Sequence, residues 1–159
     1  MIKKFKIRKI EGLIYLMAFL LLFVAPIFVN FNPLSGRVPQ ITQAPLKGTM
    51  LQKPKFIYFW AKWCATCEKM KAPISTLLND YDGVSIAVRS GPDEQLQPYL
   101  TQHQLDWLTI NDENGTIANQ YFVNAVPTIF ILNANGEIAF VTLGYMSEWS
   151  LRFRLWLAN

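Results

Sequence analysis

FIYFWAKWCATC, residues 56–67, contains the change of pattern on which the interpretation of the whole chain depends. An apolar, aromatic-rich run of strand length ends at Cys64 and Cys67, the only two cysteines in the sequence. After Cys67 the apolar residues recur at three- and four-residue steps, which is the spacing of a helix. The sequence therefore predicts that both cysteines lie where a strand ends and a helix begins.

The start of a helix is a favourable place for thiol chemistry. Backbone N–H groups in the first turn have no intrahelical partner, and the helix dipole favours negative charge there. A thiolate on Cys64 would be stabilised, and its pKa would fall below the ~8.5 of a free cysteine. Cys67 comes one turn later on the same side, more buried, which suits a resolving thiol. We predict thiol–disulfide exchange with Cys64 as nucleophile, and no cofactor beyond the Cys64–Cys67 disulfide.

Other uses of two cysteines fit the sequence less well than redox exchange. A structural zinc site needs four ligands, and the sequence adds only His103, far along the chain, so no metal site is predicted. A purely structural disulfide would close too short a loop to restrict the unfolded chain much. Binding of Cu(I) by the two thiolates is chemically possible and stays open.

The basic character of the chain is confined to its first eleven residues. Five basic side chains against Glu11 give this tail a net charge of +4, which equals the +4 of the whole chain. The remainder is therefore neutral overall, and its composition indicates no nucleic-acid-binding surface.

An apolar segment follows this tail. Gly12 to Val29 holds no charged residue and, as a helix, can cross a hydrocarbon core of roughly 30 Å. A cleaved secretory signal would have a shorter apolar core followed by small residues, whereas this run ends in Ile27-Phe28-Val29-Asn30-Phe31. We predict a single-pass anchor in a bacterial cytoplasmic (inner) membrane. The basic tail would stay in the cytoplasm and the C-terminal domain would face the oxidising periplasm.

The predicted organisation has four parts: a basic tail (1–11), a transmembrane anchor (12–29), a Pro-containing polar linker (30–46) and a domain (47–159). In the domain, further strands are expected at 84–88, 108–110, 128–132 and 137–141, with a weak strand at 48–51. Helices are expected from 93 to about 103, over 116–121 and after Gly144. In the last helix Trp149, Phe153 and Trp156 share one stripe, which we predict faces the core.

Two motifs resemble those of thioredoxin-fold proteins: Trp60-Ala61-Lys62-Trp63-Cys64-Ala65-Thr66-Cys67 and, downstream, Val126-Pro127-Thr128. Lys53-Pro54-Lys55 and the closing residues 144–157 resemble more narrowly the TlpA/ResA-like, membrane-tethered protein disulfide oxidoreductases, nearest the suppressor-of-copper-sensitivity type. The likeness runs from Leu46 to the end of the chain. It implies an α/β thioredoxin fold, with a central mixed sheet flanked by helices.

The resemblance also implies a substrate-binding surface. In such proteins the matching proline is cis, lies against the active-site disulfide, and leaves the preceding residue free to pair with an extended substrate. Carried over, Pro127 would be cis and the Val126 backbone would bind substrate, beside an exposed Trp63. The implied partners are protein thiols or disulfides and a redox protein in the membrane.

The chain departs from its relatives near the second cysteine. Tyr58 stands where thioredoxins have a buried aspartate, and Met70 where ResA-like relatives often have a glutamate. Proton transfer to Cys67 would then use water, the Tyr58 phenol or a displaced carboxylate such as Glu68. These departures count against a cytochrome c maturation thiol reductase. A general disulfide exchanger is favoured, with a copper(I)-handling or copper-tolerance module and a docking module with vestigial cysteines as alternatives.

Smaller features leave questions open. Pro73 follows the second cysteine by six residues, instead of the five usual in thioredoxins, so the sequence does not fix the register of this helix relative to the motif. Lys62, two residues before Cys64, is a cation that could favour the thiolate. Ala65-Thr66 matches neither the reducing nor the oxidising dipeptides of relatives, so the direction of electron flow is not set. His103 is expected to lie at a helix end, without a catalytic role.

Overall fold

A computed structural model describes residues 15, 17, 39–41, 45–47 and 54–158 of the chain. Tyr15 and Met17, from the predicted anchor, are helical. The rest of that anchor and the weak strand predicted at 48–51 lie outside the described residues. None of the helices within the described ranges is both long enough and apolar enough to cross a bilayer.

Strands and helices alternate along most of the described domain. Their order is β1 (Phe56–Trp60), α3 (Ala65–Asp80), β2 (Gly83–Val88), α4 (Asp93–Gln102), β3 (Thr109–Asp112), α5 (Thr116–Gln120), β4 (Thr128–Leu132), β5 (Ile138–Leu143) and α6 (Glu148–Ala158). Each strand predicted within residues 54–158 is present, although β3 and β5 each end two residues later than the pattern indicated. α3 ends at Asp80, and Gly83 is the first residue of β2.

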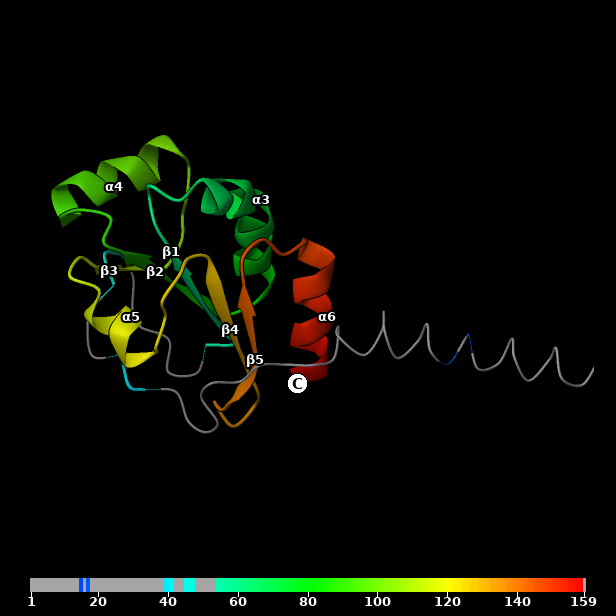
Figure 1. The fold of residues 1–159 in the computed structure, drawn as a ribbon. Coiled ribbons are helices and arrows are strands. Elements are labelled where there is room, and N and C mark those ends of the chain that lie inside the picture. The colour runs from blue at the N-terminus through cyan, green and yellow to red at the C-terminus, as the bar shows by residue number, and fades with distance from the viewer. Residues whose placement is uncertain (1–14, 16, 18–38, 42–44, 48–53, 159) are drawn as a thin grey trace, which may run out of the picture. The chain divides into compact units, whose positions relative to one another are not determined.

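The five strands form one mixed sheet in the order β3-β2-β1-β4-β5. β1 pairs in parallel with β2, and β2 with β3, while β4 runs antiparallel to both β1 and β5 (Figure 1). This is the predicted α/β architecture, with the strand that precedes the cysteines at the centre of the sheet. The carboxyl end of this central strand positions the functional site.

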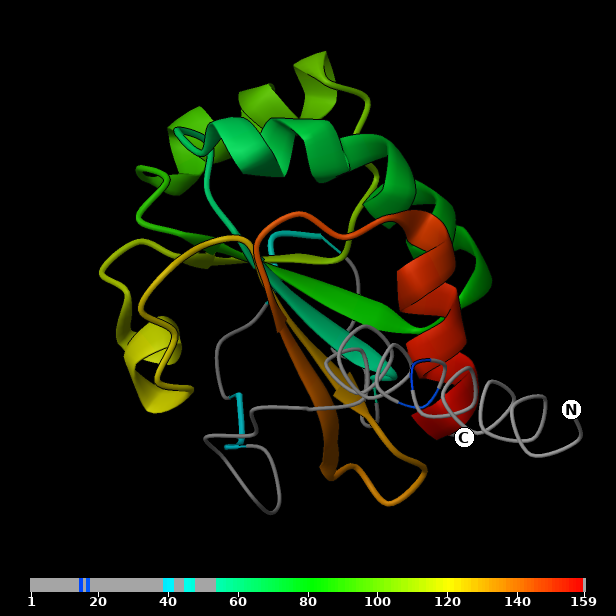
Figure 2. The same ribbon diagram turned by 45° about the vertical axis from the view of Figure 1, so that its right-hand side comes forward.

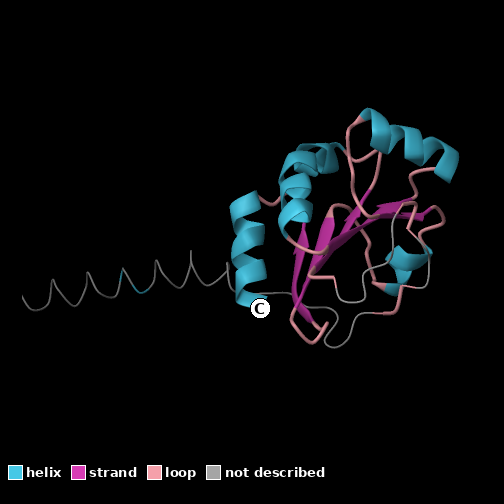
Figure 3. Ribbon diagram, turned by 180° about the vertical axis from the view of Figure 1, so that it is seen from behind, coloured by secondary structure: helices cyan, strands magenta, loops and turns pink. Residues whose placement is uncertain are grey.

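Helices cover both faces of the sheet. α3 and α6 lie against one face and α5 against the other (Figures 2 and 3). Along β1, Phe56, Tyr58 and Trp60 enter the core cluster shared with α3, α4 and α6, whereas Ile57 and Phe59 enter the cluster beside α5. Because β1 is buried on both faces, its sequence is a continuous apolar run without alternation.

The prediction for the last helix was wrong. Trp149 and Trp156 are 82% and 68% exposed, and Phe153 is also exposed, with its ring stacked on that of Trp156 at 5.9 Å between centroids. The face of α6 that enters the core carries smaller residues, Leu151, Leu155 and Ala158. Both stripes have the same spacing, so periodicity alone cannot tell which one is buried.

Described residues of the predicted linker contact the domain. The Tyr121 hydroxyl donates to the Pro39 carbonyl oxygen at 2.7 Å, and the Leu46 N–H donates to the Thr109 carbonyl oxygen at 2.8 Å. Ile41 and Leu46 pack against the two core clusters. The chain is therefore attached to the domain from residue 39 onward at the positions that the structure describes.

Candidate active site

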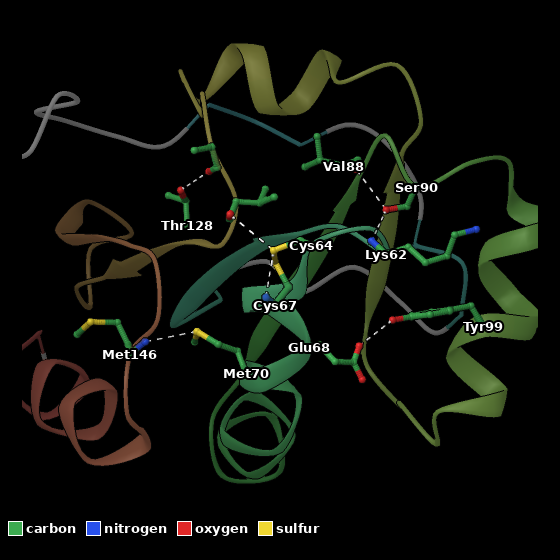
Figure 4. The surroundings of a disulfide bond; sticks show 12 residues. Lys62, Cys64, Cys67, Glu68, Met70, Val88, Ser90, Tyr99, Thr128 and Met146 are labelled. Atoms are coloured by element: carbon green, nitrogen blue, oxygen red, sulfur yellow. Dashed lines mark hydrogen bonds between the residues drawn. A yellow bond between two sulfur atoms is a disulfide. The ribbon is translucent and has the colours of Figure 1, made fainter.

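The two cysteines form a disulfide at the start of α3. β1 ends at Trp60, and Cys64 is the N-cap of the helix, with extended backbone angles (φ −90°, ψ 108°). Its Sγ accepts a hydrogen bond from the Cys67 N–H at 3.0 Å (Figure 4). The Cα atoms of the pair lie 5.2 Å apart, within the usual range for a disulfide. The strand-to-helix junction predicted from the sequence is confirmed.

The two sulfur atoms differ in access to solvent. Cys64 is half-buried, whereas Cys67 is only 2% exposed and belongs to the core cluster that includes Met70 and Ile74. An external thiol or disulfide can therefore approach Cys64 more easily than Cys67. The N–H that points at Cys64 Sγ would also stabilise negative charge on that sulfur when the bond is open.

The loop that precedes β4 lies against this disulfide. The Val126–Pro127 peptide bond is cis, as the resemblance implied, and the Val126 carbonyl oxygen is 3.7 Å from Cys64 Sγ. Thr128 Oγ1 donates to the Ala125 carbonyl oxygen at 2.7 Å, which closes the loop on itself. No hydrogen bond in the described part of the chain uses the Val126 N–H, so it is available to an extended peptide.

Trp63 completes the surface beside Cys64. Its side chain is 66% exposed, and its indole Nε1 donates to the Arg89 carbonyl oxygen at 3.0 Å. A groove of about 250 Å³ lies between Trp63 and Val126; its other lining residues include Arg89, Asn119, Val123 and Asn124. The structure thus brings together all five residues singled out from the sequence, namely Trp63, Cys64, Cys67, Val126 and Pro127.

Tyr58 occupies the position of the usual buried carboxylate but cannot act as a base. The residue is fully buried, and its hydroxyl has no hydrogen-bond partner in the part of the chain that the structure describes. Burial raises the pKa of this phenol above its ordinary value, so it stays protonated near neutral pH. Tyr58 therefore packs its ring in the core, while its hydroxyl forms no hydrogen bond with the described residues.

Glu68 and Met70 are also poorly placed to transfer a proton to or from Cys67. Glu68 is exposed, accepts a hydrogen bond from Lys71 Nζ at 2.7 Å and one from the Tyr99 hydroxyl at 3.4 Å. The Lys71 contact lowers the pKa of the Glu68 carboxyl, so it is ionised and engaged elsewhere. Met70 is fully buried, and its sulfur accepts the Met146 N–H at 3.4 Å. Both side chains are therefore engaged in contacts away from Cys67.

Lys62 does not face the disulfide. Its backbone N–H donates to Ser90 Oγ at 3.0 Å, and its side chain extends away from Cys64 (Figure 4). Its Nζ lies beside Gly91, 3.7 Å from where a Cβ on that glycine would be. The suggestion that this cation stabilises the Cys64 thiolate is not supported by its placement. His103 lies just after α4, as expected, with its ring 4.3 Å from that of Tyr99.

Sequence reasoning missed Arg89. Arg89 carries no motif, and the sequence predicts only the helix that begins at residue 93 just after it. Its backbone adopts φ +46°, a left-handed conformation that is uncommon for a residue other than glycine. The neighbouring sequence does not predict that conformation. It also does not predict the contact between Arg89 and Trp63, which lies 26 residues away in the chain.

Comparison with known proteins supports the same interpretation. A family model described as "Thioredoxin-like domain" matches residues 48–155. A thioredoxin-like protein from Haemophilus influenzae is 31% identical, over 97% of this chain and 98% of its own length. The thiol–disulfide oxidoreductase ResA of Geobacillus thermodenitrificans is 29% identical, over 82% of this chain and 74% of its own. The crystal structure of StoA from Bacillus subtilis superposes with a TM-score of 0.65 at 20% identity, covering 75% of this chain and 98% of StoA.

Proposed function

The chain belongs to the thioredoxin-like family and is a thiol–disulfide oxidoreductase, and from this premise we propose that Cys64 and Cys67 carry its reaction on protein substrates. The proposal is carried by the difference in solvent exposure between the two sulfur atoms of the disulfide at the start of α3. Cys64 Sγ is accessible beside the cis-proline loop, whereas Cys67 Sγ is buried. Such an arrangement suits a nucleophile and its resolving partner.

The exchange proceeds in two displacements. In the reduced protein the Cys64 thiolate attacks one sulfur of a substrate disulfide, and the other substrate sulfur leaves as a thiolate that takes up a proton. The Cys67 thiolate then attacks Cys64 Sγ, which closes the internal disulfide and releases the second substrate thiol. Two electrons pass to the substrate, and the same steps run in reverse oxidise a substrate dithiol.

The cis-proline loop and Trp63 are proposed to hold the substrate during both steps. The free Val126 N–H can pair with an extended peptide as an added strand would, while the exposed Trp63 ring supplies apolar contact. Because the Val126 carbonyl oxygen lies next to Cys64 Sγ, a peptide paired there would present its own sulfur to that atom.

Reduction of insulin disulfides by the full-length protein tests the catalytic roles. We expect Cys64→Ser to abolish turnover, and Cys67→Ser to accumulate a mixed disulfide with substrate because the resolving thiol is missing. Titration of the same reduced sample with Cu(I) tests the main rival, a copper-handling module. Tight Cu(I) binding without any exchange activity would replace the present proposal with that one.

We also propose where the protein works. The apolar run from Gly12 to Val29 and the basic tail before it support a single-pass anchor in the inner membrane, with the thioredoxin-like domain in the periplasm. A membrane redox protein on that side would regenerate the cysteine pair. The narrower likeness to the suppressor-of-copper-sensitivity type stays a prediction.

A further inference from the structure

The groove between Trp63 and Val126 has a mixed character. An indole ring and three valines, Val88, Val123 and Val126, give it apolar walls, while Arg89, Asn119 and Asn124 are its polar residues. Of the residues that line it, Arg89 alone carries a charge. A peptide whose cysteine reaches Cys64 would place a neighbouring side chain in this groove, because Val126 borders both the groove and Cys64 Sγ.

The position of Arg89 is fixed on both sides. Its backbone N–H donates to the Asp112 carbonyl oxygen at 2.9 Å, and its own carbonyl oxygen accepts the Trp63 indole N–H at 3.0 Å. The side chain lies over Gly115, where an added Cβ would be only 2.7 Å from Arg89 Nε. The absence of a side chain at Gly115 therefore makes room for the guanidinium at this place.

The guanidinium has no internal counter-charge. Among the described residues, no carboxylate forms an ion pair with Arg89. Asp112, whose carbonyl oxygen accepts the Arg89 N–H, is buried. Its two carboxylate oxygens accept the N–H groups of Ile117 and Ala118, at 3.0 and 2.8 Å. Arg89 therefore brings a positive charge, unpaired among the described residues, to the border of the groove, with its guanidinium over Gly115.

We propose that this groove selects substrates with a glutamate or aspartate within two residues of the reactive cysteine. The carboxylate would pair with Arg89, and the methylene stem would lie against the Trp63 ring. This inference rests on the proposed function, since it names the substrate class that the exchange reaction prefers. An arginine paired with a carboxylate at a half-open site favours binding by about threefold to tenfold.

The test uses three short peptides that differ at one position, two residues before a single cysteine: Glu, Gln or Lys. A second set carries the change two residues after the cysteine. Each cysteine is converted to a mixed disulfide with uncharged thiopyridine, so that attack by the reduced full-length protein releases a coloured product. The measured quantity is the second-order rate constant for each peptide.

We expect the Glu peptide of at least one set to react about threefold to tenfold faster than its Gln counterpart, and the Lys peptide more slowly. Arg89→Gln should remove this ranking, and salt should weaken it because exposed charges are screened. Lys69→Gln is the matched control: it removes the same charge from an exposed α3 residue that does not line the groove, and should preserve the ranking.

Two results would overturn the inference. One is a Glu-to-Gln ratio within about twofold of unity in both sets, which is too small for a charged contact. The other is a common loss of rate for all peptides in Arg89→Gln, which would show that Arg89 acts only through Trp63. If the unmodified protein reacts with none of the peptides, the exchange function itself fails, and the selectivity with it.

Discussion

Tyr58 shows how a residue can occupy a functional position without the function. Its hydroxyl is buried, unpartnered in the described residues and, because burial raises its pKa, protonated at all ordinary pH values. We expect Tyr58→Phe to leave the exchange rate unchanged within about twofold and to stabilise the domain by up to about 1 kcal/mol, because an unpaired buried hydroxyl costs free energy. Insulin reduction and denaturant unfolding measure the two effects. A large loss of exchange would instead assign Tyr58 a role in proton transfer.

Gly115 lies beneath Arg89 with φ +76°, a backbone conformation that side chains disfavour. Gly115→Ala should lower the free energy of unfolding by about 1–2 kcal/mol and, by displacing the guanidinium, reduce the preference for the Glu peptide. Gly136→Ala is a close control, because Gly136 has φ +80° but open space around it. It should show the backbone cost without the change in substrate preference. Equal peptide selectivity in both variants would contradict the placement of Arg89.

Glu68 gives the α3 surface a small dependence on pH. Its hydrogen bond from Lys71 lowers the pKa of the carboxyl in the folded state, so this contact stabilises the domain above the unfolded value near 4.5. The contribution is lost as the pH falls through the lower folded-state pKa. Because the side chain is exposed, we expect well under about 1 kcal/mol. The difference in unfolding free energy between Glu68→Gln and the unmodified protein should shrink between pH 7 and pH 3; a constant difference would count against the contact.

At the level of secondary-structure elements, α6 provides the sharpest test of which side chains form the core. Leu155→Ala should cost about 2–4 kcal/mol, because it removes buried methyl groups and leaves a cavity. Trp156→Ala, one residue further along, should cost less than about 1 kcal/mol because that ring is exposed and loses only its contact with Phe153. Denaturant unfolding of both variants decides the matter. The opposite order would restore the original expectation that the aromatic stripe faces inward.

The failure at α6 and the success at β1 have different physical origins. β1 is a central strand, so its unbroken apolar run has one sensible explanation. Two stripes of α6 have identical spacing: residues 149, 153 and 156, and residues 151, 155 and 158. The prediction favoured the first stripe because its aromatic side chains are larger, and it was wrong. Which stripe is buried depends on the space left beside α3 and β4, and that information is not local.

The cysteine pair and the cis-proline loop were predictable because each has a recognisable motif at a fixed place in the fold. Arg89 and the direction of the Lys62 side chain were not. Their positions depend on backbone angles and contacts between segments more than twenty residues apart, and short-range patterns do not record these. The substrate-contacting residues outside the motif therefore required the structure.

At the scale of the whole molecule, the two cysteines also report on the orientation of the chain in the membrane. They are the only thiols in the sequence, so a membrane-impermeant maleimide can label the protein only at Cys64 and Cys67. After reduction, in cells with a permeabilised outer membrane, we expect labelling before the inner membrane is opened. Deletion of residues 12–29 should delay labelling until lysis, since the domain would then stay in the cytoplasm. Labelling of the full chain only after lysis would contradict the proposed orientation.

Cys64 supplies the reactive sulfur and is also the N-cap of α3, because its Sγ accepts the Cys67 N–H. Any inactivating substitution at this position therefore changes the capping of α3 as well as the reactivity of the site. Serine keeps an oxygen able to accept that N–H and is among the best residues at a helix start, whereas alanine leaves the first turn uncapped at a cost of about 1 kcal/mol. In Cys64→Ala, the loss of the nucleophile could not be separated from fraying of the first turn of α3. Cys64→Ser removes the sulfur while keeping a capping oxygen, so it measures the contribution of the sulfur alone.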